Sequence, residues 1–227
     1  MKQILQSFKT GETFLEELPV PNVNTGEVLI QTKCSLVSLG TEKMLIEFGR
    51  SSLANKARQQ PEKVKEVLEK IKSEGLFPTI EAVFNKLGQP IPLGYCNMGT
   101  VLNVGDGVIG FSVGDRVCSN GPHAEVVSVP QNLVCKIPDE VSDEDASFTV
   151  IGSIGLQGVR LISPALGETI VVIGLGLIGL ITCQLLKANG VKVLGIDLDS
   201  KKCDIAKKLG ITTLNSNLDN IIEVALE

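Results

Sequence analysis

The chain has 227 residues, a formal net charge of −5 and 43% hydrophobic residues, while aromatic residues make up only 4%. This length suits one large or two modest domains, and the aliphatic composition suits buried parallel strands. The acidic balance disfavours nucleic acid as a partner, and no apolar run reaches the roughly 18 residues of a membrane span. We therefore expect a small-molecule partner, no nucleic acid and no membrane.

The cysteines and the N-terminus indicate a reducing compartment. The six cysteines form no CxxC pair, which is typical of reduced thiols rather than of a disulfide framework or a zinc finger. The first residues lack the apolar stretch of a signal peptide. These features predict a cytoplasmic protein. The cysteines are Cys34, Cys96, Cys118, Cys135, Cys183 and Cys203.

The first part of the chain divides into strand-rich and helical segments. Residues 1–42 and 91–138 are rich in Val, Ile and Leu and carry turn residues, which indicates short strands of an all-β unit. Residues 43–89 instead have apolar residues at helical spacing, with Pro61 at a helix start and a second helix expected over about 78–87. We interpret this insertion as a lid or packing helix pair, with a partner-binding site as the alternative. The apolar stripes are Val64, Val67, Leu68 and Ile71 in one helix, and Ile80, Val83, Phe84 and Leu87 in the other.

The second part of the chain alternates between strand and helix patterns. Ser142 and the three acidic residues after it are typical of a helix N-cap and first turn, which predicts a linking helix toward Leu161. From Glu168 onward the pattern is βαβαβ. We therefore expect one domain over residues 1–148 and a second over 149–227. The expected strands are 169–174, 191–196 and 211–214, and the expected helices are 177–189, 200–209 and a short run over 218–226.

Residues 171–180 (VVIGLGLIGL) place a GxGxxG motif between a predicted strand and a predicted helix. Gly174 allows a tight turn, Gly176 lets the backbone approach a pyrophosphate, and Gly179 lets helix and strand pack closely. The helix N-terminus adds free N–H groups and a positive dipole end. The candidate phosphate-binding residues are Gly174, Leu175, Gly176, Leu177, Ile178 and Gly179.

Asp197 follows directly on the strand predicted over 191–196, the second strand of the βαβαβ pattern. Its carboxylate would accept hydrogen bonds from ribose hydroxyls and repel a 2′-phosphate, which favours NAD over NADP. A glycine turn alone is weak evidence, because a purely structural βαβ turn also uses glycine. Here strand, glycines, helix, second strand and terminal acid occur in the order that dinucleotide binding requires, so we predict an NAD site.

Four segments precede the glycine turn in a recognisable order: 92–101 (PLGYCNMGTV), 105–117 (GDGVIGFSVGDRV), 124–130 (AEVVSVP) and 137–139 (IPD). Together with the turn they resemble the medium-chain dehydrogenase/reductase superfamily, which includes the zinc-type alcohol dehydrogenases. The resemblance implies α/β plus all-β architecture: a GroES-like β-barrel, here with a helical insertion, followed by the N-terminal half of a Rossmann fold. It also implies that Lys202 contacts the adenosine ribose, and it allows a homodimer in the full-length protein.

The insertion and its flanks resemble a narrower group within that superfamily. The segments that carry this likeness are 40–44 (GTEKM), 57–61 (ARQQP) and 92–97 (PLGYCN). Similar segments occur in two-part bacterial and archaeal oxidoreductases, in which a glucose–fructose-oxidoreductase-like module follows the dehydrogenase half. Those proteins are usually associated with surface-polysaccharide genes, so the likeness implies a sugar or sugar nucleotide as substrate.

The positions that hold catalytic zinc in the family carry other residues here. Leu39 stands at the position of one cysteine ligand, Tyr95 at that of the histidine, and Ile151 at that of the other cysteine. Zinc needs three N, S or O ligands and an open position, which Leu and Ile cannot supply. We therefore expect no zinc, and we interpret His123 as a surface-loop residue.

Hydride chemistry without a metal needs another group that stabilises charge on the substrate oxygen. By resemblance, the candidates are Tyr95, Thr41 at the hydroxyl of the family's proton relay, and Glu42, which could orient or deprotonate either one. A positioned general acid supplies about 10²–10⁴ in rate, enough for an easy carbonyl or a conjugated alkene. The alternative for Tyr95 is a core tyrosine whose hydroxyl bonds the backbone. We interpret Cys96 as an inert buried thiol.

These observations predict a zinc-independent, NAD(H)-dependent oxidoreductase that transfers a hydride to or from a carbonyl or alcohol. The alternatives are an enone or quinone reductase and a non-catalytic dinucleotide-binding scaffold. A full dinucleotide-binding fold has six strands, and only three are recognisable after Glu168. We therefore expect a chain truncated within its Rossmann domain, inactive by itself and prone to associate through the open edge of the third strand.

Overall fold

The structure, a computed structural model, describes residues 1–74, 83, 85 and 87–217. It consists of two compact units, Met1–Ser147 and Phe148–Glu227. Within the described ranges, no helix has the length and apolar character needed to cross a membrane.

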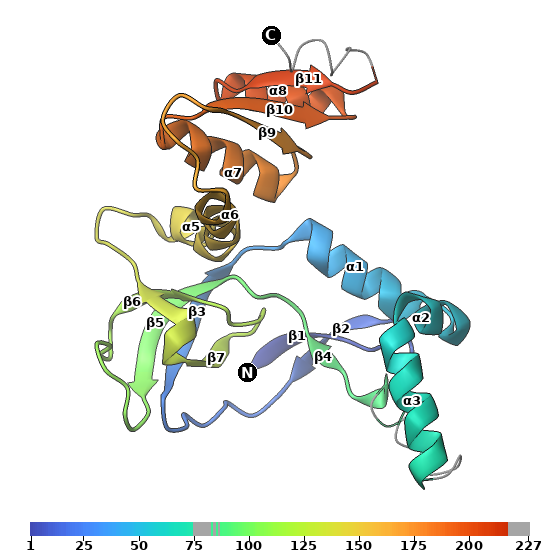
Figure 1. Cartoon of the computed structure of the whole chain (residues 1–227). Coiled ribbons are helices and arrows are strands. Elements are labelled where there is room, and N and C mark those ends of the chain that lie inside the picture. Colours follow the sequence, from blue (N-terminus) through green and yellow to red (C-terminus); the bar gives the residue numbers. More distant parts are fainter. Residues whose placement is uncertain (75–82, 84, 86, 218–227) are drawn as a thin grey trace. The chain divides into compact units, whose positions relative to one another are not determined.

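The first unit is built from two antiparallel sheets (Figure 1). One has the strand order β2-β1-β4 and the other the order β7-β3-β5-β6-β8. The strands carry Val, Ile and Leu at alternating positions, as strands with one buried face require. The strands are β1 (Lys2–Gln6), β2 (Thr13–Glu17), β3 (Glu27–Ser35), β4 (Ile91–Pro92), β5 (Asn97–Val104), β6 (Arg116–Ser119), β7 (Val126–Pro130) and β8 (Val134–Lys136).

Residues 123–125 join the two sheets of the first unit. The backbone N–H of Ile4 donates to the carbonyl of His123 at 2.9 Å, and the N–H of His123 donates to Leu93 at 2.7 Å. An isolated bridge between Gln3 and Ala124 continues the pairing. The five-stranded sheet carries a core of aliphatic side chains, as expected from the low aromatic content. Its buried members include Val28, Ile30, Val101, Val117, Val127 and Val129.

Between β3 and residue 74 the chain forms three helices: α1 (Leu39–Arg50), α2 (Leu53–Gln59) and α3 (Pro61–Glu74). The helix start at Pro61 is confirmed. Helix α1 begins before residue 43, so the expectation of strands throughout 1–42 is wrong for its last residues, and Thr41 and Glu42 lie on the first turn of α1. The second helix expected over 78–87 lies largely outside the described residues.

The second unit is a three-stranded parallel sheet with the order β11-β10-β9. One face packs against helices through a core that includes Leu175, Cys183, Cys203 and Ala206. On the other face Ile173 is 84% exposed. The strands are β9 (Thr169–Ile173), β10 (Lys192–Asp197) and β11 (Thr212–Asn215), and the helices are α6 (Thr149–Ile162), α7 (Leu177–Ala188) and α8 (Ser200–Lys208).

The βαβαβ order predicted for residues 168–217 is confirmed, and the run over 218–226 lies outside the described residues. The N-cap at Ser142 is also confirmed, because its hydroxyl accepts the N–H of Asp145 at 3.0 Å. The single linking helix is wrong. A short helix α5 (Asp143–Ala146) ends in the first unit, and α6 begins separately at Thr149.

Candidate functional site

The glycine turn lies between β9 and α7, where its local geometry requires glycine at two positions. Gly174 has a φ of +94°, a left-handed conformation that side chains other than glycine rarely adopt. A Cβ on Gly179 would lie 1.8 Å from the carbonyl oxygen of Gly174. The turn therefore folds back tightly on the first residues of α7 and directs their backbone N–H groups outward.

Gly176 is the N-cap of α7, and a Cβ built there would meet no described atom within 4 Å. Its lack of a side chain is therefore not needed for packing. Open space beside a helix N-terminus is what a pyrophosphate requires, since the backbone N–H groups and the helix dipole both favour an anion there. The residues present fit a dinucleotide.

Asp197 at the end of β10 is tied to this turn. One carboxylate oxygen accepts the N–H of Leu175 at 2.7 Å, and the other accepts the N–H of Asp199 at 2.9 Å. The ammonium group of Lys202 lies 3.6 Å from the carboxylate. Desolvation raises the pKa of Asp197, but the hydrogen bonds from Asp199 and Leu175 and the charge of Lys202 together bring it below its ordinary value. The residue therefore presents a negative charge beside the glycine turn.

In the first unit, three hydroxyl groups come together at the start of α1. The phenol of Tyr95 donates to the Ser38 hydroxyl at 2.8 Å and lies 3.4 Å from the Thr41 hydroxyl. Ser38 is the N-cap of α1 but makes no side-chain capping bond. Tyr95 is half-buried and Thr41 is exposed, so this hydroxyl cluster (Ser38, Thr41 and Tyr95) includes a group open to solvent.

Glu42 lies behind the hydroxyl cluster. One of its carboxylate oxygens accepts the backbone N–H of Ser38 at 2.7 Å, and the other lies 3.0 Å from Nε2 of His123. Among the hydrogen bonds of the described residues, none joins this carboxylate to Tyr95 or Thr41. Glu42 thus holds the first turn of α1 and is linked to the cluster through the backbone N–H of Ser38, a bond that corresponds to one half of a capping box.

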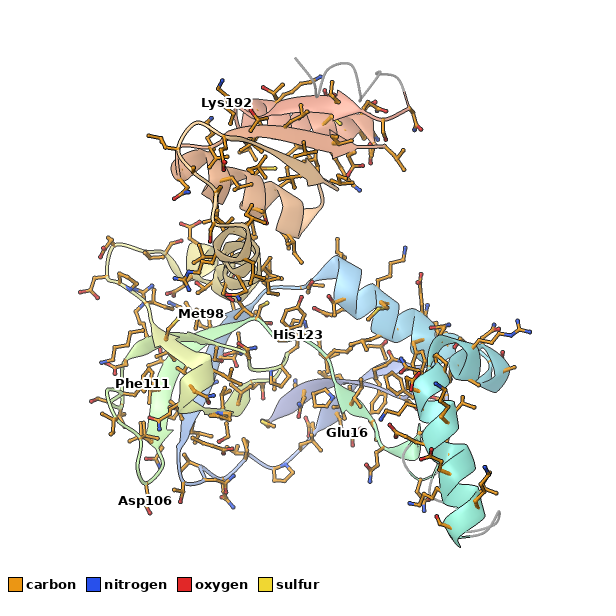
Figure 2. All side chains as sticks on the ribbon, in the orientation of Figure 1. Glu16, Met98, Asp106, Phe111, His123 and Lys192 are labelled. Atoms are coloured by element: carbon orange, nitrogen blue, oxygen red, sulfur yellow. The ribbon has the colours of Figure 1, made fainter. Side chains whose placement is uncertain are left out.

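His123 is not the surface-loop residue that the sequence predicted. Its side chain is 7% exposed, with Nδ1 at 2.8 Å from the Ser35 hydroxyl and Nε2 against Glu42. Figure 2 shows His123 inside the first unit, between the strands and α1. The turn before β7 lies in the interior of the unit because residues 123–125 form backbone hydrogen bonds that connect the two sheets.

Gly94 provides the space for the imidazole of His123. It has a φ of +89°, and a Cβ there would lie 2.6 Å from the His123 ring. Sequence reasoning missed this buried Ser35–His123–Glu42 group because His123 is more than 80 residues away from the other two members. The available signal was that the sole histidine follows a Gly-Pro turn leading into an apolar strand.

The residues at the family's zinc positions are not arranged as ligands. Leu39 is 76% exposed and Ile151 is fully buried, and neither carries a donor atom. Among the residues that the structure describes, no three His, Cys, Asp or Glu side chains converge as a metal site would require. The residues present do not fit a catalytic zinc. Cys96 is fully buried, as expected.

Comparison with known proteins links the second unit to nucleotide cofactors. Residues 168–227 match the NAD binding domain of the UDP-glucose/GDP-mannose dehydrogenase family. The chain is 35% identical over 122 residues to D-guloside 3-dehydrogenase of Escherichia coli (strain K12), covering 52% of this chain and 35% of that protein. It is 28% identical over 162 residues to (R,R)-butanediol dehydrogenase of Bacillus subtilis (strain 168), covering 59% and 47%. The chain thus spans half or less of the length of these relatives.

Solved structures share the fold over nearly the whole chain. An alcohol dehydrogenase of Escherichia coli CFT073 in complex with NADH has a TM-score of 0.76 at 21% identity, covering 100% of this chain and 65% of that one. A quinone oxidoreductase of Pseudomonas syringae has a TM-score of 0.71 at 23% identity, covering 99% and 62%. The predicted fold class, a GroES-like unit followed by part of a Rossmann fold, is confirmed. The relatives and neighbours are oxidoreductases of the medium-chain, alcohol dehydrogenase-like type.

Proposed function

We propose that this chain is part of an NAD(H)-dependent oxidoreductase that works without zinc and transfers a hydride to or from a carbonyl or alcohol, with a polyol or sugar as substrate. The glycine turn carries the proposal: Gly174 has a positive φ, Gly179 leaves no room for a side chain, and the space beside Gly176 is open. The relatives named for a guloside and for butanediol support the substrate class.

NADH, when bound, supplies the hydride. The protein then has to supply a proton to the oxygen that becomes an alcohol, and to accept that proton in the reverse direction. We assign this proton transfer to the Tyr95 hydroxyl. Its bonds to Ser38 and Thr41 provide a route by which the phenol is reprotonated, since Thr41 is exposed to solvent. The N-terminus of α1 favours negative charge that develops on these oxygens.

Glu42 and His123 act as positioning residues in this proposal. Of the hydrogen bonds that the described residues make, the one from the Ser38 backbone N–H to Glu42 links this pair to the hydroxyl cluster. By fixing the first turn of α1, they keep Ser38 and Thr41 within reach of Tyr95. A displacement of about 1 Å can cost about a hundredfold in rate, so this fixation matters for the chemistry.

A second candidate is the reduction of an alkene conjugated to a carbonyl. A relative at 29% identity over 162 residues is the acryloyl-coenzyme A reductase of Metallosphaera sedula, which covers 57% of this chain and 48% of that protein. In that reaction Tyr95 would protonate the enolate left after hydride addition. The same residues serve both reactions, so only the accepted substrate separates them.

The test measures NADH consumption by the full product of the gene, with keto-sugars, small ketones and enones, and the reverse reaction with polyols and NAD⁺. Each assay is run before and after dialysis against a chelator. We expect turnover with one carbonyl class, unaffected by chelation. Tyr95→Phe should lower kcat by about 10²–10⁴ while the Kd for NADH stays unchanged.

Thr41→Val tests the same cluster with a smaller expected loss, and Thr10→Val provides a control at a hydroxyl in the turn between β1 and β2. NADH binding without turnover on any substrate would favour the scaffold alternative. Full activity in Tyr95→Phe would refute the role of the phenol. Activity lost on chelation and restored by zinc would refute the zinc-free mechanism.

A further inference from the structure

A pair of cysteines in the first unit lies outside the site described above. Cys118 on β6 and Cys135 on β8 occupy directly opposite positions of the antiparallel pair. Their sulfur atoms are 3.0 Å apart. Cys118 is 3% exposed, whereas Cys135 is exposed on the edge strand of the five-stranded sheet.

The backbone geometry at this pair suits a covalent link. The N–H of Ile137 donates to the carbonyl of Arg116 at 2.9 Å, and the N–H of Asn120 donates to that of Leu133 at 3.3 Å. Because hydrogen-bonded and non-hydrogen-bonded pairs alternate along antiparallel strands, Cys118 and Cys135 form a hydrogen-bonded pair, with Cα atoms about 5.5 Å apart. A disulfide needs a Cα separation of about 4.4–6.8 Å. The sulfurs need to move by only about 1 Å to reach bonding distance.

We propose that Cys118 and Cys135 are a redox-modification site, at which a hydroperoxide converts two thiols into a disulfide that braces the edge strand β8. Cys135 is the exposed thiol that meets the oxidant, and Cys118 is the resolving thiol behind it. The link closes the loop Ser119–Val134, which contains β7 and His123. Oxidation would therefore fix the segment that carries the buried Ser35–His123–Glu42 group.

The chemistry has two steps. The Cys135 sulfur attacks one oxygen of hydrogen peroxide, the O–O bond breaks, and Cys135 becomes a sulfenic acid as one water leaves. The Cys118 sulfur then attacks the sulfenic sulfur, the S–S bond forms, and the S–O bond breaks to release a second water. The two thiols lose two electrons and two protons in all, and the peroxide is reduced to two waters.

The surroundings set the rate of this reaction. The hydrogen bond shared with Cys118, which favours the protonated thiol of Cys135, and then burial raise the pKa of Cys135 well above its ordinary value. Since the thiolate is the nucleophile, oxidation is slow at neutral pH and faster in alkaline solution. Burial raises the pKa of Cys183 to about 11, and that thiol is fully buried in the core of the second unit. Cys183 is therefore a suitable unreactive reference.

Mass spectrometry can test the pairing directly. Trypsin cleaves after Arg116 and Lys136, and the peptide between them contains these two cysteines and no others. After treatment with hydrogen peroxide and alkylation under denaturing conditions, we expect this peptide to be lighter by two hydrogens and to carry no alkyl group. Cleavage after Glu125 should leave two halves that separate only on reduction.

The controls are single serine variants. Cys118→Ser and Cys135→Ser should abolish the mass loss, whereas Cys34→Ser and Cys183→Ser should leave it unchanged. Alkylation of both Cys118 and Cys135 after peroxide treatment would overturn the proposal. So would sulfinic acid at Cys135 beside an alkylated Cys118, or a disulfide between Cys135 and another chain.

Thermal unfolding tests the bracing of β8. A disulfide that closes a loop of this length should raise the Tm of the first unit by about 5 °C, reversibly with a thiol reductant. The Cys135→Ser variant treated with peroxide should show no rise. An unchanged or lowered Tm in a chain that carries the disulfide would overturn the bracing.

Discussion

The two candidate sites differ in how they are assembled. The glycine turn comes from one short stretch of chain, with Asp197 supplied by the next strand. The hydroxyl cluster and the group behind it come from segments around residues 35–42, 95 and 123, and the bond between Glu42 and His123 joins residues 81 positions apart. A local site shows itself in sequence spacing, whereas a non-local one depends on sheet register. Single substitutions should therefore damage the two sites in different ways.

The largest effect is expected at Gly179. Gly179→Ala places a Cβ 1.8 Å from a backbone oxygen that cannot move without opening the turn. We expect this variant to destabilise the second unit by about 3 kcal/mol or more and to lose NADH binding. Hydrogen exchange of α7 peptides measures the first effect, and NADH fluorescence titration measures the second.

Gly176→Ala and Gly152→Ala are the matched controls for Gly179→Ala. A Cβ at either position meets nothing within 4 Å. Gly176→Ala should fold normally but weaken NADH binding about tenfold or more, because the methyl occupies the space for the pyrophosphate. Gly152→Ala in α6 should leave binding intact and cost no stability, since Ala favours a helix by up to about 1 kcal/mol. If hydrogen exchange of the α7 peptides is unchanged in Gly179→Ala, the close contact between Gly179 and Gly174 does not fix the turn.

The next effect concerns the non-local group. Removing one partner of a buried hydrogen bond leaves the other polar group unsatisfied and costs about 1–3 kcal/mol. We therefore expect Glu42→Gln and His123→Gln each to lower the free energy of unfolding by about 2–3 kcal/mol, and the double variant to cost less than their sum. Denaturant unfolding, followed through the signal of the only tyrosine, measures all three.

Glu47→Gln on the same helix α1 is the control for this cycle. Its exposed pair with Lys43 spans 3.7 Å, and the loss should stay below about 0.5 kcal/mol. If the losses in unfolding free energy of Glu42→Gln and His123→Gln simply add in the double variant, the contact between these two residues does not hold the start of α1.

Features that depend on neighbouring residues could be predicted from the sequence, whereas features that depend on distant residues could not. The N-cap at Ser142, the start of α3 at Pro61 and the glycine turn depend on neighbours within a few residues, and they could be predicted. The start of α1 at Leu39 is not predicted because the sequence interpretation assigns Thr41 and Glu42 to a catalytic motif and does not consider Glu42 as the acceptor of the Ser38 N–H. The burial of His123 and the pairing of Cys118 with Cys135 depend on strand register, which the spacing of residues does not reveal.

Asp197 offers a smaller effect within the local site. Its carboxylate binds the N–H of Leu175 and would also meet the ribose, so Asp197→Asn should weaken NADH binding about tenfold and reduce the preference over NADPH. Parallel titrations with NADH and NADPH measure both. Lys202→Met, which removes only the cation 3.6 Å away, should change NADH affinity less. Equal affinities for the two cofactors in the unaltered chain would contradict the assignment of Asp197.

The smallest effect is expected at Asp143, the first residue of α5, whose carboxylate bonds Lys33 on β3 and Arg116 on β6. The hydrogen bond from Lys33, followed by that from Arg116, lowers the pKa of Asp143 below its ordinary value. A group whose pKa is lower in the folded than in the unfolded state stabilises the fold above its unfolded pKa, about 3.9, and loses that contribution as the pH falls through the folded value. Asp143→Asn should therefore lower the Tm by a few °C near neutral pH. The gap to the unaltered chain should close below about pH 4, and Asp139→Asn, at an exposed carboxyl just before α5, should show no such gap. A Tm difference that stays constant from neutral to acidic pH would mean that the carboxylate charge does not hold α5 against β3 and β6.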